Sequence, residues 1–227
     1  MPSYYRHNNQ PHIQPIGATF SITILTHDAV PEPEIKALRD KRDRALHKIE
    51  LDGAPDKAYR ASLMHALYEN ELEDLLNQKR QQEYPFKNYL AAEAFIQRVK
   101  QYHKQYYHLL ALVVMANHVH LLLDFSVQLP LNHDGISMPK GYTKLGVVMN
   151  RIKGGGAYDV NRAIGREGPL WGKRYYDRYI RSAKHLHQAF WYILRNPVKA
   201  GLVEQWEEYP YTYAHPGLLE DLQWDRM

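Results

Sequence analysis

The sequence predicts an α+β fold in which helices pack against an antiparallel sheet. Short apolar segments with the two-residue period of strands alternate with longer segments whose apolar residues recur at helical spacing. The predicted order is a strand, helices, two strands, a helix, a strand and a helix, which is a ferredoxin-like arrangement. Hydrophobic residues make up 44% of the 227 residues, which is ample for a core. We expect one domain that spans 1–227.

The first part of the chain combines one strand with a pair of helices. Residues 17–26 alternate between apolar and polar side chains and predict the first strand. Two apolar patterns at helical spacing follow within 31–82, and Gly53-Ala54-Pro55 separates them. We therefore expect a helical hairpin over 31–82 as an insertion in the domain, with a solvated helix pair as its simplest role.

The middle of the chain predicts a helix followed by two strands. Asn88 is suited to cap a helix that runs to about Tyr102. The apolar segment 113–124 is rich in valine and leucine, and the two residues Ala116-Asn117 interrupt it. This pattern predicts two buried strands joined by a tight turn. Residues 126–140 contain two prolines and a glycine and predict a loop.

The last part of the chain predicts a helix, a strand, a second helix and a tail. Apolar residues recur at helical spacing from Leu145 to Ile152. The segment 153–156, Lys-Gly-Gly-Gly, is then expected to form a flexible loop. A strand rich in tyrosine lies near 171–181, a helix is expected over 182–197, and 204–227 forms an acidic C-terminal tail.

Two histidines one residue apart are the most informative feature of the chain. His118 and His120 lie in the segment Val-Val-Met-Ala-Asn-His-Val-His-Leu-Leu-Leu-Asp. Residues i and i+2 of a strand point to the same face, so the imidazoles project side by side, about 7 Å apart along the strand. Two ring nitrogens at that spacing can converge on one metal ion or one phosphate. A structural role is the alternative, since the chain contains 13 histidines.

A second cluster lies on the helix predicted over 182–197. Ser182 is suited to its N-cap, and Pro197 marks its end. At about 100° per residue, apolar and polar residues fall on opposite faces. The apolar face holds Leu186, Phe190, Ile193 and Leu194, and the polar face holds His185, Gln188, Tyr192 and Asn196. Tyr192 and Asn196 are four residues apart and are therefore expected to be neighbours. A packing role for Tyr192 is the alternative to a nucleophile.

These motifs together resemble the HUH single-tyrosine transposases, and within them the REP-associated tyrosine transposases and their insertion-sequence relatives. His118-Val119-His120 is similar to the histidine–hydrophobic–histidine motif of the family. Residues 171–181 and 192–203 are similar to its two other motifs, in the same order, and the opening at Tyr5-Arg6-His7 with residues 16–23 is similar as well. The resemblance covers most of the chain except the helical segment after the first strand. Ala116 departs from it, because proline is usual there.

The resemblance implies a metal-dependent enzyme, with an HUH nuclease core, that cuts and rejoins single-stranded DNA. Tyr192 is the implied nucleophile, and it would give a 5′-phosphotyrosine and a free 3′-hydroxyl. His118, His120 and Asn196 are the implied metal ligands. Imidazole and amide ligands without cysteine favour Mg²⁺ or Mn²⁺, which polarises the phosphoryl oxygen and neutralises developing charge. The implied substrate is DNA that forms hairpins or repeats.

Three other tyrosines are rival nucleophiles. Tyr175, Tyr176 and Tyr179 lie in the Tyr-rich strand, on either side of Asp177. At least two of the three are expected to pack, and Tyr176 or Tyr179 could instead stack on a base. We therefore rank Tyr192 first among the candidate nucleophiles.

The distribution of charge also indicates a nucleic-acid partner. The net charge is only +4, but residues 141–200 carry 12 Lys and Arg against 3 Asp and Glu, whereas 201–227 carry 1 against 6. A basic segment interleaved with Trp and Tyr suits a nucleic-acid backbone and unstacked bases, and a solvated face is the alternative. The expected DNA contacts are Lys144, Arg151, Lys153, Arg174, Arg178 and Arg181.

Two other functions stay open at this point. The chain could bind folded single-stranded DNA without catalysis, or it could hydrolyse phosphodiesters with a metal and water, in which case Tyr192 would not matter. We find no secretory signal and no apolar segment of membrane-spanning length, so we expect a cytoplasmic protein without a membrane partner. A homodimer is a further partner to consider, and the 31–82 hairpin could contact a second copy or the DNA.

Overall fold

The chain divides into two compact units, residues 28–84 and the remainder, and each is described by itself. The computed structural model describes residues 3–7, 10–80 and 82–223, with side chains from residue 14 to 222 except 81. The larger unit contains both histidines and Tyr192, so it carries the site predicted from the sequence.

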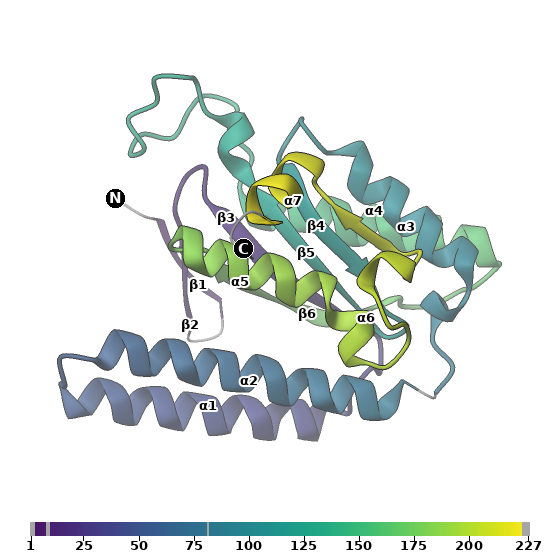
Figure 1. Ribbon diagram of the computed structural model, residues 1–227, viewed down its shortest axis with the longest axis horizontal. Helices are drawn as coiled ribbons and strands as arrows, with labels where there is room; N and C mark the ends of the chain where they lie inside the picture. The colour runs from purple at the N-terminus through teal and green to yellow at the C-terminus, as the bar shows by residue number, and fades with distance from the viewer. Residues whose placement is uncertain (1–2, 8–9, 81, 224–227) are drawn as a thin grey trace. The chain divides into compact units, whose positions relative to one another are not determined.

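The larger unit is built on a five-stranded antiparallel sheet with the order β6-β3-β5-β4-β7 (Figure 1). Its strands are β3 (Thr19–Thr26), β4 (His108–Val114), β5 (His118–Asp124), β6 (Trp171–Tyr179) and β7 (Thr212–Ala214). A separate antiparallel hairpin precedes it, formed by β1 (Ser3–His7) and β2 (Gln10–Gln14). The side chains of Tyr5, Arg6 and His7 lie outside the described residues.

Five α-helices and three short 3-10 helices complete the larger unit within the described residues. The α-helices are α3 (Tyr89–Gln101), α4 (Leu145–Ile164), α5 (Ala183–Leu194), α6 (Asn196–Lys199) and α7 (Pro216–Gln223). The 3-10 helices are η1 (Pro85–Lys87), η2 (Phe125–Gln128) and η3 (Trp206–Glu208). With α3 before β4, α4 between β5 and β6, and the strand order β6-β3-β5-β4, the core is a ferredoxin-like unit. The predicted α+β class is confirmed.

The two faces of the sheet bury different layers of helices. On one face, Phe20, Ile22 and Ile24 of β3 pack with α3 and α4 in the main core. On the other face, Val113 and Leu122 pack with apolar residues of α5. Figure 1 shows α5 crossing one side of the sheet, with α3 and α4 on the opposite side. Successive strand residues point to opposite faces of the sheet. The strand residues that lie between those of the main core therefore point toward α5.

Local signals in the sequence set several of these boundaries as predicted. The Oδ1 atom of Asn88 accepts a hydrogen bond from Leu90 N at 2.9 Å, which caps α3. The Oγ atom of Ser182 accepts from His185 N at 3.2 Å, which caps α5. The turn at Ala116-Asn117 is closed by a hydrogen bond from Met115 N to His118 O, at 2.9 Å. The predicted hairpin and both predicted caps are therefore confirmed.

The flexible loop predicted at Gly154 to Gly156 is wrong, because helix α4 continues through all three glycines. A Cβ atom on Gly156 would lie 2.8 Å from the ring of Phe95 on α3, and one on Gly155 would lie 2.9 Å from Arg98. The glycines therefore allow α3 and α4 to approach closely. Glycine has a low helix propensity, and the close packing of α3 against α4 offsets this cost.

The predicted helix over 182–197 also differs from the structure. Helix α5 ends at Leu194, and a short helix α6 begins at Asn196 with Pro197 in its first turn. Proline cannot continue the hydrogen bonding of α5 but is well suited to start a helix. Asn196 is therefore not on the exposed polar face of α5 but is buried at the start of α6.

The segment predicted as an acidic tail, 204–227, supplies regular structure. It contains β7, which pairs with β4 from Ala111 to Val113, and α7. The hydroxyl of Tyr209 donates a hydrogen bond to Val114 O at 3.0 Å and ties this segment to the same strand. The fifth strand of the sheet therefore comes from the most acidic part of the chain.

The smaller unit is the predicted helical hairpin. It consists of α1 (Glu32–Asp52) and α2 (Lys57–Lys79), and Gly53 ends α1 in the left-handed conformation with φ 63°. The guanidinium of Arg42 lies over the ring of Tyr68, 4.5 Å from its centroid, and Lys79 pairs with Glu34 at 2.9 Å. In the described part of both units, no helix is long and apolar enough to span a bilayer.

Candidate active site at the histidine pair

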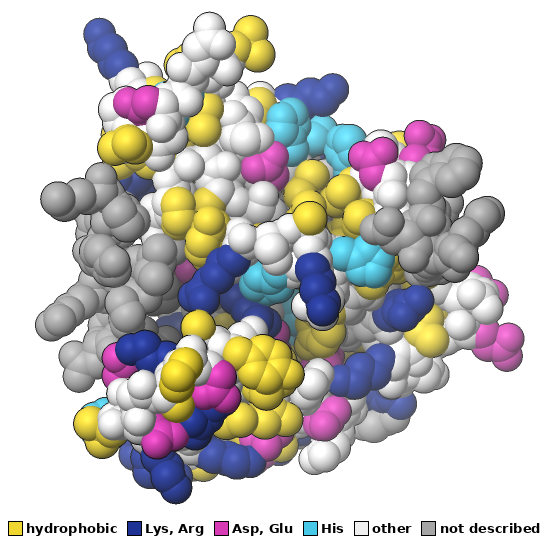
Figure 2. Space-filling model, turned by 60° about the vertical axis from the view of Figure 1, so that its left-hand side comes forward, with side chains coloured by type: hydrophobic (Ala, Val, Ile, Leu, Met, Phe, Trp, Pro, Cys, Tyr) yellow, Lys and Arg dark blue, Asp and Glu magenta, His cyan; other side chains and the backbone are white. Residues whose placement is uncertain are grey.

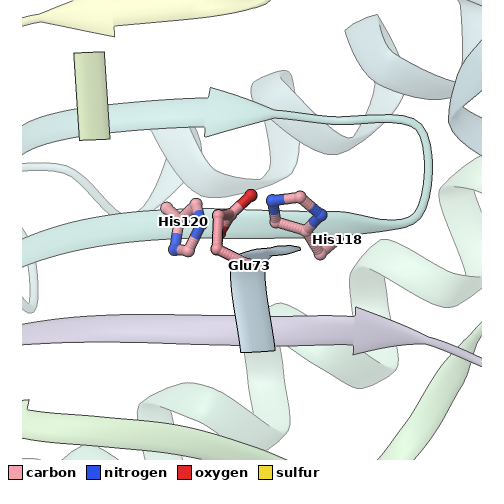
Figure 3. Close-up of side chains that lie close together, drawn as sticks. All are labelled: Glu73, His118 and His120. Atoms are coloured by element: carbon pink, nitrogen blue, oxygen red, sulfur yellow. The ribbon is translucent and has the colours of Figure 1, made fainter. Parts of the chain in front are cut away.

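The two histidines project together from β5, as the sequence predicts. His118 and His120 both lie on the sheet face that packs with α5, and their ring centroids are 4.8 Å apart (Figure 3). Both side chains are buried. The strand fixes this geometry, because β5 is an inner strand that pairs with β3 on one side and β4 on the other. The third side chain in Figure 3, Glu73, belongs to helix α2 of the smaller unit.

Hydrogen bonds orient the Nδ1 atom of each imidazole. His118 Nδ1 lies 2.8 Å from Asn117 Oδ1, which can only accept, so this nitrogen carries the proton. His120 Nδ1 lies 2.9 Å from the hydroxyl of Thr23, which faces His120 across the β3–β5 pair. With Nδ1 protonated and held, Nε2 carries the lone pair that can bind a metal ion.

Tyr192 and Asn196 reach the same histidine from the end of α5 and the start of α6. The ring of Tyr192 lies 5.6 Å from that of His120 between centroids, at an angle of 78°. The Asn196 Nδ2 atom donates to His120 Nε2 at 3.1 Å. This bond agrees with a proton on Nδ1 of His120, because Nε2 must then accept. The structure thus brings together all four residues that the sequence predicts for the catalytic and metal sites.

The donor set fits a divalent cation. Asn196 Oδ1 is buried and has no hydrogen-bond partner among the described residues, so one hard oxygen donor is unsatisfied. The Asn196 Nδ2 atom lies 3.1 Å from His120 Nε2, and a half-turn of the amide would exchange the places of Nδ2 and Oδ1 and so direct Oδ1 toward His120. Neighbouring ligand atoms around a six-coordinate Mg²⁺ ion are separated by about 3 Å. His118, His120 and Asn196 could therefore hold one ion and leave further positions open.

The rival tyrosines of β6 separate onto the two faces of the sheet. Tyr175 and Tyr179 pack at the edge of the main core, opposite Ile24 and Phe20 of β3, and burial raises the pKa of Tyr175 well above its usual value. Tyr176 points to the other face, where it is paired with Thr23. Of the three, only Tyr176 shares the sheet face of the histidine pair.

The six predicted DNA contacts also fall on both sides of the sheet. Arg178 is paired with Ser21 on the face of the histidines, whereas Arg174 lies where the register of the β3–β6 pair shifts. In contrast, Lys144, Arg151 and Lys153 belong to the start of α4, on the opposite layer. Arg181 follows β6 and directly precedes the N-cap of α5. Figure 2 shows lysine and arginine side chains beside histidines on one face.

Lys153 has a structural contact that the sequence did not reveal. Its Nζ atom donates to Gly172 O at 3.1 Å and lies 6.0 Å from the centroid of the Tyr175 ring. Burial lowers the pKa of this amine. Arg151 lies over the ring of Tyr106, 4.7 Å from its centroid. Both cations therefore stabilise the layer of α3 and α4, where aromatic rings and carbonyl oxygens hold them.

Comparison with known proteins supports the resemblance seen in the sequence. No family model matches the chain. A Haemophilus influenzae protein named REP-associated tyrosine transposase is 33% identical over 105 residues, which cover 46% of this chain and 57% of that protein. The chain is similar to a REP-associated tyrosine transposase. The match spans little more than half of that protein's length, so activity and partners do not transfer with the likeness.

A solved structure is also similar to the chain over most of its length. It is described as a REP-associated tyrosine transposase bound to a REP hairpin. The likeness has a TM-score of 0.42 and 18% sequence identity, and it covers 98% of this chain and 88% of the other.

Two residues of the site were missed in the sequence. Thr23 lies far from the histidines along the chain, and only the pairing of β3 with β5 places it beside His120. Asn117 directly precedes His118, and its side chain holds His118 Nδ1. A polar residue before the motif was a visible signal for Asn117, but the sequence contains none for Thr23.

Proposed function

We propose that this protein cleaves single-stranded DNA and transfers the strand through a 5′-phosphotyrosine on Tyr192. The observation that carries the proposal is the convergence of Tyr192 and Asn196 on His120, 5.6 Å between ring centroids and 3.1 Å between nitrogen atoms. The similarity to a REP-associated tyrosine transposase supports a DNA substrate that forms hairpins or repeats.

In this mechanism Tyr192 supplies the nucleophilic oxygen. Its Oη atom forms a bond to the scissile phosphorus as the bond from phosphorus to the 3′ oxygen breaks. The phenol loses a proton and the 3′ oxygen gains one, so the step needs no further reactant. One phosphodiester replaces another, and the reaction is therefore reversible. A new 3′-hydroxyl can attack the phosphotyrosine and rejoin the strand.

His118, His120 and Asn196 would hold the Mg²⁺ or Mn²⁺ ion that the donor set fits. A bound divalent ion polarises the phosphoryl oxygen and stabilises developing negative charge. Asn117 and Thr23 keep the proton on Nδ1 of each histidine, at 2.8 and 2.9 Å. The two Nε2 lone pairs are therefore fixed before substrate binds, which reduces the reorganisation that the reaction requires.

The proposal is tested by mixing the protein with single-stranded DNA from the flanks of its own gene and Mn²⁺, and separating the products on a denaturing gel. We expect a covalent protein–DNA band that is lost in Tyr192→Phe. Tyr176→Phe is the matched control, because it removes a hydroxyl from the same face of the sheet, and it should keep the band.

Other outcomes distinguish the alternatives. A band that survives Tyr192→Phe but not Tyr176→Phe would move the nucleophile to β6. Cleaved DNA without an adduct would indicate a phosphodiesterase that uses water. DNA binding without cleavage under any of these conditions would indicate a binding protein that lacks catalysis.

A further inference from the structure

A line of three side chains runs along helix α5 to its C-cap, next to the proposed nucleophile. His187, Trp191 and Arg195 are four residues apart, so they follow one another on the same side of the helix. The ring centroids of His187 and Trp191 are 6.4 Å apart, and the guanidinium carbon of Arg195 lies 5.4 Å from the centroid of the Trp191 ring. Trp191 is buried, whereas Arg195 is exposed. The line therefore ends in a cation that rests on an indole ring and reaches solvent.

The backbone places Arg195 beside the candidate active site. Arg195 N donates a hydrogen bond to Trp191 O at 3.0 Å, so the helical path of α5 continues to this residue. Tyr192 precedes Arg195 by three residues, and side chains at this spacing on a helix are neighbours, with Cβ atoms about 5–6 Å apart. Asn196 follows Arg195 directly. Arg195 is therefore an exposed cation between two residues that contact the buried His120.

The charge of Arg195 has no acidic partner within the part of the chain that the structure describes. The interaction of its guanidinium there is with the Trp191 ring, which carries no opposite charge. Residues 183–203 contain no Asp or Glu. The carboxylate of Glu208, in the segment that follows, accepts hydrogen bonds from Glu204 N and Gln205 N, at 3.0 and 3.1 Å.

The contact with the indole leaves the donors of Arg195 available. A guanidinium is attracted to the face of an aromatic ring through its charge, and it still presents a planar set of N–H donors at its edge. The indole also restricts the positions that the long side chain can take. Arg195 can therefore bind an anion without breaking an ion pair within the described residues.

We propose that Arg195 binds a backbone phosphate of the DNA strand beside Tyr192, and that Trp191 holds the guanidinium in position for this contact. The inference rests on the proposed function, because the ligand is the strand that Tyr192 cuts. A guanidinium offers two parallel N–H donors to a phosphate, and such pairs are charge-assisted. Contacts to phosphate fix the register of a nucleic acid and do not read its sequence. Arg195 therefore sets the position of the strand against Tyr192 whatever the bases are.

The test measures binding of a fluorescent oligothymidylate at several salt concentrations, in EDTA so that metal-dependent cleavage does not occur. Arg195→Gln is expected to bind more weakly, and the slope of log K against log salt should fall in magnitude by about 0.7, as for one lost phosphate contact on a single strand. Arg195→Lys keeps the charge and should keep the slope. Arg162→Gln is the charge control, because Arg162 is an exposed residue of α4 on the opposite layer. Equal slopes in Arg195→Gln and Arg162→Gln would overturn the contact.

Urea denaturation of the same variants separates the proposal from a purely structural role. A cation near the C-terminus of a helix interacts favourably with the helix dipole, and packing on Trp191 also stabilises the fold. If Arg195 had only these roles, Arg195→Gln would lower the urea midpoint and leave the salt slope of DNA binding unchanged. That combination would overturn the proposal, whereas a reduced slope in a folded Arg195→Gln protein supports it.

A further measurement distinguishes DNA from free phosphate as the ligand. The indole N–H resonance of Trp191, assigned by comparison with Trp191→Phe, is followed by NMR as oligothymidylate or inorganic phosphate is added. We expect the oligonucleotide to shift this resonance at a lower concentration than inorganic phosphate, and we expect the shift to be lost in Arg195→Gln. A shift with inorganic phosphate alone, or one that persists in Arg195→Gln, would overturn a contact with backbone phosphate.

The two proposals fail in different ways. If Arg195→Gln reduces the salt slope but no adduct on Tyr192 forms in the wild type, the phosphate contact is supported and strand transfer is not. If the wild type forms the adduct and Arg195→Gln keeps the full salt slope, strand transfer is supported and the phosphate contact is not.

Discussion

At the scale of single residues, the site depends on which nitrogen of each histidine carries the proton. Thr23 and Asn117 contact Nδ1 of His120 and His118, which leaves Nε2 as the nitrogen with the lone pair, and on His120 this lone pair accepts from Asn196 Nδ2. Such contacts around metal ligands commonly contribute as much to affinity as a weak ligand does. We therefore propose that the two residues act as positioning residues, through His120 and His118.

Replacing Thr23 with valine tests this role, because valine keeps the shape of threonine and removes the hydroxyl. We expect Mn²⁺ affinity to fall about 10–100-fold, since Nδ1 of His120 loses its partner. Titration calorimetry with Mn²⁺ measures the effect without requiring DNA cleavage. Thr23→Ser restores the hydroxyl and should retain the affinity. A Thr23→Val protein that binds Mn²⁺ as tightly as the wild type would contradict the positioning role.

At the scale of elements, the packing of α3 against α4 gives the clearest contrast between neighbouring residues. Gly156→Ala would place a methyl group 2.8 Å from Phe95, so we expect it to destabilise the protein by about 1–3 kcal/mol. Gly154→Ala is the control, because nothing lies within 4 Å of its added methyl group. It should instead stabilise the helix by up to about 1 kcal/mol. Urea denaturation measures both, and equal stabilisation by the two substitutions would be inconsistent with close packing.

Elements set by local signals were predictable from the sequence, whereas those set by distant contacts were not. The caps at Asn88 and Ser182 and the turn at Ala116-Asn117 depend on residues within a few positions. The continuous helix through Gly154 to Gly156 depends on Phe95, which lies on another helix. The sequence shows three glycines but not the neighbour that makes them favourable.

The residues of the candidate site also separate into those that the sequence predicted and those that depend on distant contacts. His118, His120, Tyr192 and Asn196 were predictable from motifs and from the family resemblance. Thr23 was not, because strand register is absent from a single sequence. The burial of Asn196 was also missed, since it follows from the break between α5 and α6 at Arg195.

At the scale of the whole molecule, the excess of positive charge in 141–200 is divided between the two layers of the larger unit. Only the residues on the α5 side share a face with the histidines. We expect Arg178→Gln to weaken single-stranded DNA binding and to lower its salt dependence, because Arg178 is paired with Ser21 on the face of the histidines. Arg151→Gln should have little effect on DNA, because Arg151 lies over Tyr106 on the other layer. Fluorescence anisotropy compares the two, and a larger loss for Arg151→Gln would place the DNA on the α4 side.

The larger assembly stays a prediction. The sequence left the oligomeric state open with a homodimer as one partner to consider, and the hairpin of α1 and α2 could contact a second copy or the DNA. Sedimentation velocity over a range of concentrations would measure the state of the free protein. The same measurement with hairpin DNA would show whether the substrate changes it.

Strand transfer through Tyr192 is best tested by identifying the amino acid that carries the DNA. The covalent product is digested with a nuclease and a protease, and the peptide that retains a nucleotide is sequenced by mass spectrometry. We expect a phosphodiester on Tyr192, formed only when a divalent metal is present. A nucleotide on Tyr176, or on any other residue, would contradict it.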